Sequence, residues 1–181
     1  MLDRGLVIST FGNASLRTHE GMLITPTSLD YRTTSPDDIV AMDLDGNRIA
    51  GVRDPSSEFR LHLAIYRARP DVRAIVHVHT LSAIAFALVS DALPPLTEEA
   101  VHFTGSVRVS PYVEAGTDEL GSAAVGALGS DGRAIIMRGH GVVAIGDTLD
   151  EALTRCEIAE RGAAIYMAAR GAGWDGRWTS T

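Results

Sequence analysis

The sequence is poor in the features that mark several classes of protein. Its 181 residues include a single cysteine, Cys156, so an intrachain disulfide is excluded. Basic residues are not in excess, because 23 acidic side chains outnumber 16 basic ones and the net charge is -7. An acidic surface attracts neither nucleic acid nor an anionic membrane, and we therefore expect neither as the main partner.

Long apolar runs are also missing. The longest uncharged apolar stretch, residues 81–89, has about half the length that a membrane-spanning helix needs. Residues 1–10 lack the basic start and apolar core of a signal peptide. The chain has no internal repeat, low-complexity tract or linker. We expect one soluble cytoplasmic domain over residues 1–181, with residues 171–181 as a short tail.

The order of the local signals predicts an α/β (α+β) fold. Alternating apolar residues around two turns, at 20–21 and 45–47, predict hairpins, so the N-terminal third should be antiparallel. A turn at "RGHG" separates two further expected strands. Helical signals occupy residues 57–69, 81–89, 117–128 and 148–170. Together they predict a central, mostly antiparallel sheet covered by helices, with Cys156 on a buried helix face.

Two histidines interrupt an apolar strand in "AIVHVH". His77 and His79 are two residues apart, so on a strand they share a face and can grip one metal ion. His140, between two glycines in "RGHG", is a candidate third ligand, and Glu58 is a candidate fourth ligand or a base. Catalytic zinc usually takes three protein ligands and keeps one position open. The alternative is that these are ordinary core or surface histidines.

Three loops are suited to binding an anion. Hydroxyl groups and amide N–H groups gather in "FGNASLR", in "ITPTS" and in "PSSE", which lies where a helix should begin. A helix N-terminus with free N–H groups attracts phosphate. Each loop taken alone is equally consistent with an ordinary turn or helix cap. The residues concerned are Gly12, Asn13, Ser15, Thr25, Thr27, Ser28, Ser56 and Ser57.

Four motifs in order resemble those of the class II aldolase/adducin family. "FGNASLR" is similar to its G-N-x-S-x-R segment and "ITPTSLDY" to its I-T-P-[TS]-G-x-x-Y segment. "PSSEFRLHLAIYRARPDVRAIVHVH" resembles its S-S-E helix and H-x-H strand, and "RGHGVVAIGDTLDEAL" its N-H-G block. The resemblance covers roughly residues 5 to 170 and is strongest to the branch of the L-fuculose-1-phosphate aldolases.

The resemblance implies a site and an assembly. His77, His79 and His140 would hold Zn2+, Glu58 would act as acid and base beside the metal, and the chain would form a fourfold homotetramer. The residues implied to bind the substrate phosphate are Asn13, Thr27, Ser28, Ser56 and Ser57.

The resemblance also implies a reaction. A ketose 1-phosphate would be cleaved to dihydroxyacetone phosphate and an aldehyde, with the metal stabilising an enediolate. Three alternatives stay open at this point. They are decarboxylation of a phosphorylated 3-oxo sugar acid, 4-epimerisation of a pentulose phosphate, and a non-enzymatic adducin-like interaction domain.

The chain departs from the family pattern at two places. Ser28 replaces a glycine, and a left-handed backbone there would cost a serine about 1 kcal/mol. Family aldolases carry a tyrosine, donated by the neighbouring subunit, in the segment that matches "LPPLTEEAVHF", which has none. Glu98, Glu99 and His102 are the candidates for this second proton-transfer group, and the alternative is that "TEEAVH" is a solvated helix face. In the tail, Trp174 and Trp178 are expected to serve packing or an interface.

Overall fold

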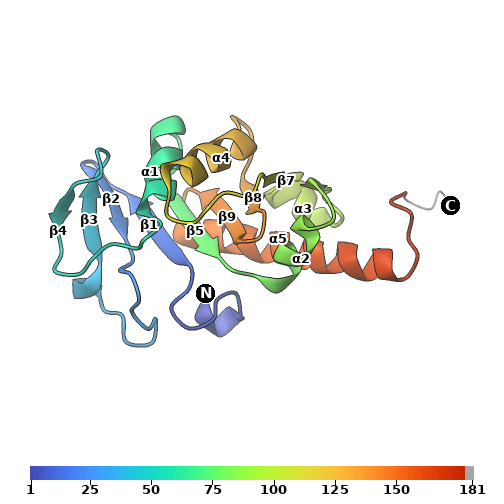
Figure 1. The fold of residues 1–181 in the computed structure, drawn as a ribbon, viewed down its shortest axis with the longest axis horizontal. Helices are drawn as coiled ribbons and strands as arrows, with labels where there is room; N and C mark the ends of the chain where they lie inside the picture. The colour runs from blue at the N-terminus through green and yellow to red at the C-terminus, as the bar shows by residue number, and fades with distance from the viewer. Residues whose placement is uncertain (178–181) are drawn as a thin grey trace.

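A nine-stranded sheet runs through the computed structural model, which describes residues 1–177 (Figure 1). The strand order is β4-β3-β2-β1-β5-β9-β8-β7-β6, and every neighbouring pair is antiparallel except β7 with β8. The strands are β1 (Asn13–Arg17), β2 (Gly21–Ile24), β3 (Val40–Asp43), β4 (Arg48–Ala50), β5 (Ala74–Val78), β6 (Ala92–Leu93), β7 (Val107–Ser110), β8 (Ala134–Met137) and β9 (Gly141–Gly146).

Helices cover both faces of the sheet. One apolar cluster joins the sheet to α2 and α5, and a second cluster joins the opposite face to α1 and α4. The helices are α1 (Phe59–Ala68), α2 (Leu81–Ala87), α3 (Glu98–Phe103), α4 (Asp118–Leu128) and α5 (Leu149–Gly171), with short 3-10 turns at Leu2–Arg4 and Pro36–Asp38. The expected helix-covered, mostly antiparallel sheet is confirmed.

Strand β5 lies at the centre of the sheet and is buried along its whole length. Val76 and Val78 pack in the cluster with α2 and α5, whereas Ile75 packs in the cluster with α1 and α4. Because side chains alternate along a strand, His77 shares the face of Ile75 and points toward α1. Burial on both faces explains why this stretch is almost continuously apolar apart from its histidines.

Polar side chains hold the helix ends. The Thr148 hydroxyl accepts a hydrogen bond from the N–H of Glu151 (3.1 Å) and caps α5. Helix α2 is capped from outside, because the Glu160 carboxylate of α5 accepts the N–H groups of Ser82 (2.9 Å) and Ala83 (2.8 Å). This contact ties the start of α2, directly after the histidine strand, to the longest helix of the protein.

The expected helices form within about two residues of their expected ends. Cys156 is fully buried on α5, as expected. Helix α3 forms at the "TEEAVH" segment. Strands β6 and β7 were not expected, because they are short and depend on their neighbours in the sheet for pairing. No helix within residues 1–177 combines the length and apolar character needed to cross a bilayer.

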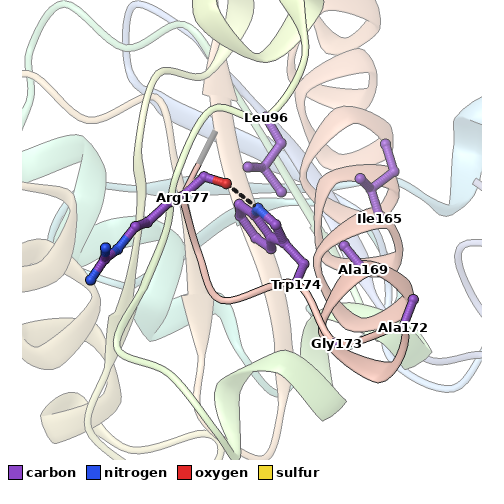
Figure 2. A pocket seen from close by; sticks show the side chains of 7 residues that line it. All are labelled: Leu96, Ile165, Ala169, Ala172, Gly173, Trp174 and Arg177. Carbon is purple, nitrogen blue, oxygen red and sulfur yellow. Dashed lines mark hydrogen bonds between the residues drawn. The ribbon is translucent and has the colours of Figure 1, made fainter. Parts of the chain in front are cut away.

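A cavity lies at the far end of α5, away from the histidine strand. It has a volume of about 610 Å³ and is lined mostly by apolar groups of Leu96, of α5 and of the segment that follows it (Figure 2). Trp174 packs edge-on against Tyr166 here, with ring centres 5.8 Å apart, which confirms its packing role. Trp178 lies outside the described residues. Arg177 is the only titratable group among the described lining residues, so these residues offer no acid or base for catalysis.

Candidate metal and substrate site

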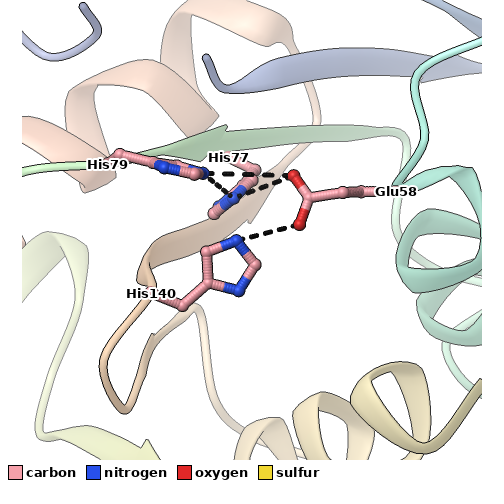
Figure 3. Close-up of side chains that lie close together, drawn as sticks. All are labelled: Glu58, His77, His79 and His140. Atoms are coloured by element: carbon pink, nitrogen blue, oxygen red, sulfur yellow. Dashed lines mark hydrogen bonds and ion pairs between the residues drawn. The ribbon is translucent and has the colours of Figure 1, made fainter. Parts of the chain in front are cut away.

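Three separate segments bring an acidic side chain and three imidazoles together (Figure 3). Glu58 directly precedes α1, His77 and His79 lie at the end of β5, and His140 occupies the turn between β8 and β9. That turn depends on its glycines. Gly139 has a φ of 67°, and a Cβ added to Gly141 would lie 2.2 Å from the carbonyl oxygen of Val78.

The four side chains converge on one point. One ligand atom from each lies within 4.8 Å of all the others. The Nε2 atoms of His77 and His79 are 2.8 Å apart, and the Glu58 carboxylate lies 3.2 Å from His77 Nε2 and 2.9 Å from His140 Nε2. Tetrahedral zinc ligands at their usual bond lengths lie about 3.3 Å from one another. The predicted residues are therefore brought together with spacings close to those of a metal site.

The hydrogen bonding of the cluster also fits a divalent ion. His77 Nδ1 donates to the carbonyl of Val142 (2.9 Å), which turns Nε2 toward the centre of the cluster. Glu58 Oε1 and His140 Nδ1 are buried yet make no directed hydrogen bond, although His140 Nε2 lies close to Oε1. Buried polar atoms without partners are costly, and a bound cation would satisfy the carboxylate oxygen.

Burial and mutual contacts shift the acidity of these groups. Burial alone would raise the pKa of Glu58, but the contacts from the His140 and His77 imidazoles outweigh it and hold that pKa well below its usual range. Burial, together with the neighbouring imidazoles of His77 and His140, lowers the pKa of His79 to about 4. At neutral pH the cluster thus offers an ionised carboxylate and a neutral His79, the forms that bind a metal.

A cavity of about 130 Å³ adjoins the candidate metal ligands. All five residues implied to bind phosphate line it, together with Glu58 and His79; these five are Asn13, Thr27, Ser28, Ser56 and Ser57. Ser28 has a φ of 56°, so the serine does adopt the left-handed backbone for which the family uses glycine. The side chain of Asn13 is buried and its amide nitrogen donates to Glu58 Oε2 (2.9 Å).

Several residues near the site were not singled out from the sequence. Phe11 stacks on the His79 ring, with ring centres 5.5 Å apart, and lines the same cavity. The Tyr31 hydroxyl donates to the carbonyl of Gly12 (2.6 Å) and so anchors the loop that precedes Asn13. Behind the cavity wall, the buried side chain of His62 forms a hydrogen bond with Asn13, which in turn bonds to Glu58. The signal for His62 was its place four residues after Glu58, on the same helix face.

The candidates for the second proton-transfer group lie elsewhere in the chain. Glu98, Glu99 and His102 belong to α3, which packs against α5, and none of them lines the cavity beside Glu58. Glu98 and His102 lie 3.9 Å apart, with 92% and 73% of their side chains exposed. Within one chain, these groups face solvent.

The match to known proteins agrees with this geometry. Residues 1–167 match the family described as Class II Aldolase and Adducin N-terminal domain. The chain belongs to the class II aldolase and adducin family. It is 37% identical to the 5-deoxy-D-ribulose 1-phosphate aldolase of Bacillus thuringiensis serovar kurstaki, over 96% of this chain and 82% of the relative.

Other class II aldolases give the same picture. The chain is 35% identical to the L-fuculose phosphate aldolase of Methanocaldococcus jannaschii, over 92% of this chain and 90% of the relative. The solved structure of the L-fuculose-1-phosphate aldolase from Thermus thermophilus superimposes with a TM-score of 0.86 at 31% identity, covering 98% of this chain and 92% of that one. The fold and the family are thus supported by both sequence and structure.

Proposed function

We propose that this class II aldolase cleaves a ketose 1-phosphate to dihydroxyacetone phosphate and an aldehyde, using a divalent ion held by His77, His79, His140 and Glu58. The observation that carries the proposal is the convergence of these four groups beside a cavity lined by hydroxyl groups. We infer zinc, because three imidazole nitrogens and one carboxylate form a ligand set that suits this ion.

The amino-acid composition supports a metal-dependent route. Aldol cleavage needs an electron sink at the substrate carbonyl, and a protein can supply it through a lysine Schiff base or through a metal. All 16 basic residues of this chain are arginines, so no lysine side chain is present to form a Schiff base. A divalent ion would supply the sink instead, as a Lewis acid for the oxygens of the carbonyl substrate.

The residues around the ion would divide the remaining work. Glu58 lies against the ligands with an ionised carboxylate, and it would accept and return the proton of the reacting hydroxyl group. Thr27, Ser28, Ser56 and Ser57 would anchor the phosphate through hydroxyl and backbone N–H groups, with Asn13 beside them in the same cavity. Binding energy at the phosphate would keep the carbon–carbon bond in register with Glu58.

A second proton-transfer group would come from a neighbouring subunit. Glu98, Glu99 or His102 would fill this role, since all three are exposed on α3 and none lines the cavity of its own chain. The site would then be complete only in a homo-oligomer, for which we propose the fourfold homotetramer implied by the family motifs. A cytoplasmic location remains a prediction.

The reaction can be tested with a panel of phosphorylated sugars. Zinc-loaded protein should release dihydroxyacetone phosphate from L-fuculose 1-phosphate or 5-deoxyribulose 1-phosphate, whereas Glu58→Gln should retain most of the metal and lose at least about a hundredfold in kcat. The same incubations should include phosphorylated 3-oxo sugar acids and pentulose 5-phosphates. Carbon dioxide or an epimerised sugar, formed without dihydroxyacetone phosphate, would assign the site to a decarboxylase or an epimerase.

A further inference from the structure

A continuous chain of hydrogen bonds runs from the interior to the Glu58 carboxylate. The Tyr66 hydroxyl lies 2.9 Å from Ser15 Oγ, which lies 2.6 Å from His62 Nδ1. On the other side of the same ring, His62 Nε2 lies 2.6 Å from Asn13 Oδ1, and Asn13 Nδ2 lies 2.9 Å from Glu58 Oε2. His62 is completely buried, and Asn13 and Ser15 are each 2% exposed.

The residues of this hydrogen-bond chain belong to a strand and a helix that face each other. Asn13 and Ser15 are two residues apart on β1, so both point to the same side of the sheet. Glu58, His62 and Tyr66 follow one another at intervals of four residues at the start of α1 and along it, and therefore share one helix face. Each polar residue of the strand is thereby placed between two polar residues of the helix.

Chemistry assigns a direction to the first two links. Asn13 meets Glu58 through Nδ2, an NH2 group that can only donate, so the Glu58 carboxylate accepts. The amide oxygen of Asn13 then faces His62, and it too can only accept. The hydrogen of His62 must therefore be on Nε2.

The direction of the remaining two hydrogen bonds follows from the protonation of the His62 ring. Burial lowers the pKa of His62 to about 3, so the imidazole is uncharged near neutral pH and its Nδ1 is an acceptor. Ser15 must donate its hydroxyl hydrogen to that nitrogen, which leaves its oxygen to accept from the Tyr66 hydroxyl. All four hydrogen bonds thus point in one direction, toward Glu58. Aligned hydrogen bonds of this kind polarise and strengthen one another.

We propose that His62, Ser15 and Tyr66 are positioning residues, which fix the Asn13 amide and through it the orientation of the Glu58 carboxylate. This inference rests on the proposed role of Glu58 as acid and base. The hydrogen-bond chain orients Asn13 and Glu58 and does not conduct protons, because the Asn13 amide has no acidic hydrogen to pass on. With Oε2 held by Asn13, the carboxylate cannot rotate, and Oε1 stays directed at the His140 side of the cluster.

Two substitutions at His62 distinguish the role of Nε2 from that of Nδ1. The amide nitrogen of His62→Gln can replace Nε2 and still donate to Asn13, whereas that of His62→Asn lies near Nδ1 and cannot reach Asn13. We expect kcat of His62→Gln to remain within about threefold of wild type and kcat of His62→Asn to fall at least about tenfold. In both variants KM for the ketose 1-phosphate should change by less than about threefold, because the substituted residue does not line the substrate cavity.

Control variants exclude a general loss of packing. Thr104→Val removes another buried hydroxyl that has no link to Glu58, and its kcat should equal that of wild type. Tyr66→Phe removes only the most distant link and should lower kcat by less than about threefold. Equal losses in kcat for His62→Gln and His62→Asn, or a rise in KM alone for His62→Asn, would overturn the proposal.

The tautomer of His62 supplies a test that needs neither a variant nor activity. Nitrogen-15 NMR of the histidine rings should show His62 neutral, protonated at Nε2 and bare at Nδ1 between pH 5 and pH 8, both with and without zinc. A hydrogen on Nδ1, or a cationic ring, would refute the directed chain even if the enzyme cleaves ketose phosphates. Conversely, the expected tautomer in a protein that cleaves none of them would refute the proposed function and leave the hydrogen-bond chain intact.

Discussion

The histidines of the candidate site differ in how deeply they are buried. The side chain of His77 is inaccessible to solvent and held by a backbone carbonyl, whereas that of His79 is 26% exposed and stacked under Phe11. His140 depends on a glycine turn for its position. Of the three imidazoles, His79 can therefore be replaced with the smallest disturbance of the core, which makes it the best position for testing the metal site.

We expect His79→Ala to lose most of its bound divalent ion, because two imidazoles and one carboxylate remain. Affinity for zinc should fall at least about tenfold, measured by calorimetric titration and by elemental analysis after desalting. His19→Ala, an exposed histidine between β1 and β2, should bind metal as wild type does. Undiminished metal content in His79→Ala would contradict the ligand set.

The buried imidazole of His62 makes stability depend on pH. Its pKa is lowered to about 3 by burial in the folded protein, whereas an imidazole in an unfolded chain titrates near pH 6.5. Below pH 6.5 the unfolded state binds a proton that the folded state does not. The free energy of unfolding should therefore decrease as pH falls from about 6.5 toward 3, by up to about 1.4 kcal/mol per pH unit from this residue.

Urea denaturation of the metal-free protein between pH 7.5 and pH 4.5 measures this slope. The free energy of unfolding of His62→Gln should fall less steeply with decreasing pH, because the variant has lost the group that takes up the proton. Parallel curves for the two proteins would show that His62 is already protonated in the native state.

At the scale of secondary structure, the sequence predicts most of the fold. The hairpins at the N-terminus and the four longer helices carry clear turn, cap and periodicity signals, and all of them form. Helix α3 has six residues and β6 two, too few for any periodicity. The parallel pairing of β7 with β8 is a contact between segments separated by α4, and local sequence contains no sign of such pairing.

In the site too, residues that neighbouring sequence makes conspicuous were predicted, whereas residues whose role depends on distant segments were not. His77, His79 and His140 stood out because imidazoles are unusual in an apolar strand and between glycines. His62 lies on an apolar helix face, where a histidine reads as part of the core, and its role depends on Asn13 and Ser15 in a distant strand. The capping of α2 by Glu160 also joins distant segments, and no local motif signals it.

We expect the Glu160 contact to stabilise helix α2, which follows the strand that carries His77. Glu160→Ala should lower the free energy of unfolding by about 1 to 2 kcal/mol, since two N–H groups of α2 lose a charged acceptor. Glu160→Gln, which retains an acceptor oxygen, should lose less. Glu157→Ala, on the same helix, breaks only a partly exposed pair with Arg4 and should change stability by less than about 1 kcal/mol. Chemical denaturation compares the three, and equal losses for Glu160→Ala and Glu157→Ala would rule out the cap.

At the scale of the whole molecule, exposed apolar side chains are consistent with an assembly. Leu81, Val101 and Tyr112 are among the large apolar groups left open to solvent in a single chain, at 82%, 53% and 70% exposure. Burying such groups is the main driving force for subunit association. The proposed proton donor on α3 also needs a partner chain to reach a metal site.

Light scattering of the purified protein should accordingly give about four times the 19.2 kDa mass of one chain. A fully active species with the mass of a single chain would exclude a shared site. Mixed oligomers give the sharper result. Chains carrying Glu58→Gln, combined with chains carrying alanine at the α3 donor, should regain part of the activity that each variant lacks alone, because some interfaces would pair the two intact groups.

Strand β1 and helix α1 present polar side chains to each other at slightly different spacings. Two residues of strand advance about 6.7 Å and four residues of helix about 6.0 Å, so their polar groups stay in step for only a few repeats before the offset accumulates. The last repeat is filled by Arg17, whose long side chain spans the offset: its guanidinium lies 4.6 Å above the Tyr66 ring. Neither segment can therefore change length. A single inserted or deleted residue within 13–17 or 58–66 would move the polar side chains of one element past those of the other and break the hydrogen bonds that lead to Glu58.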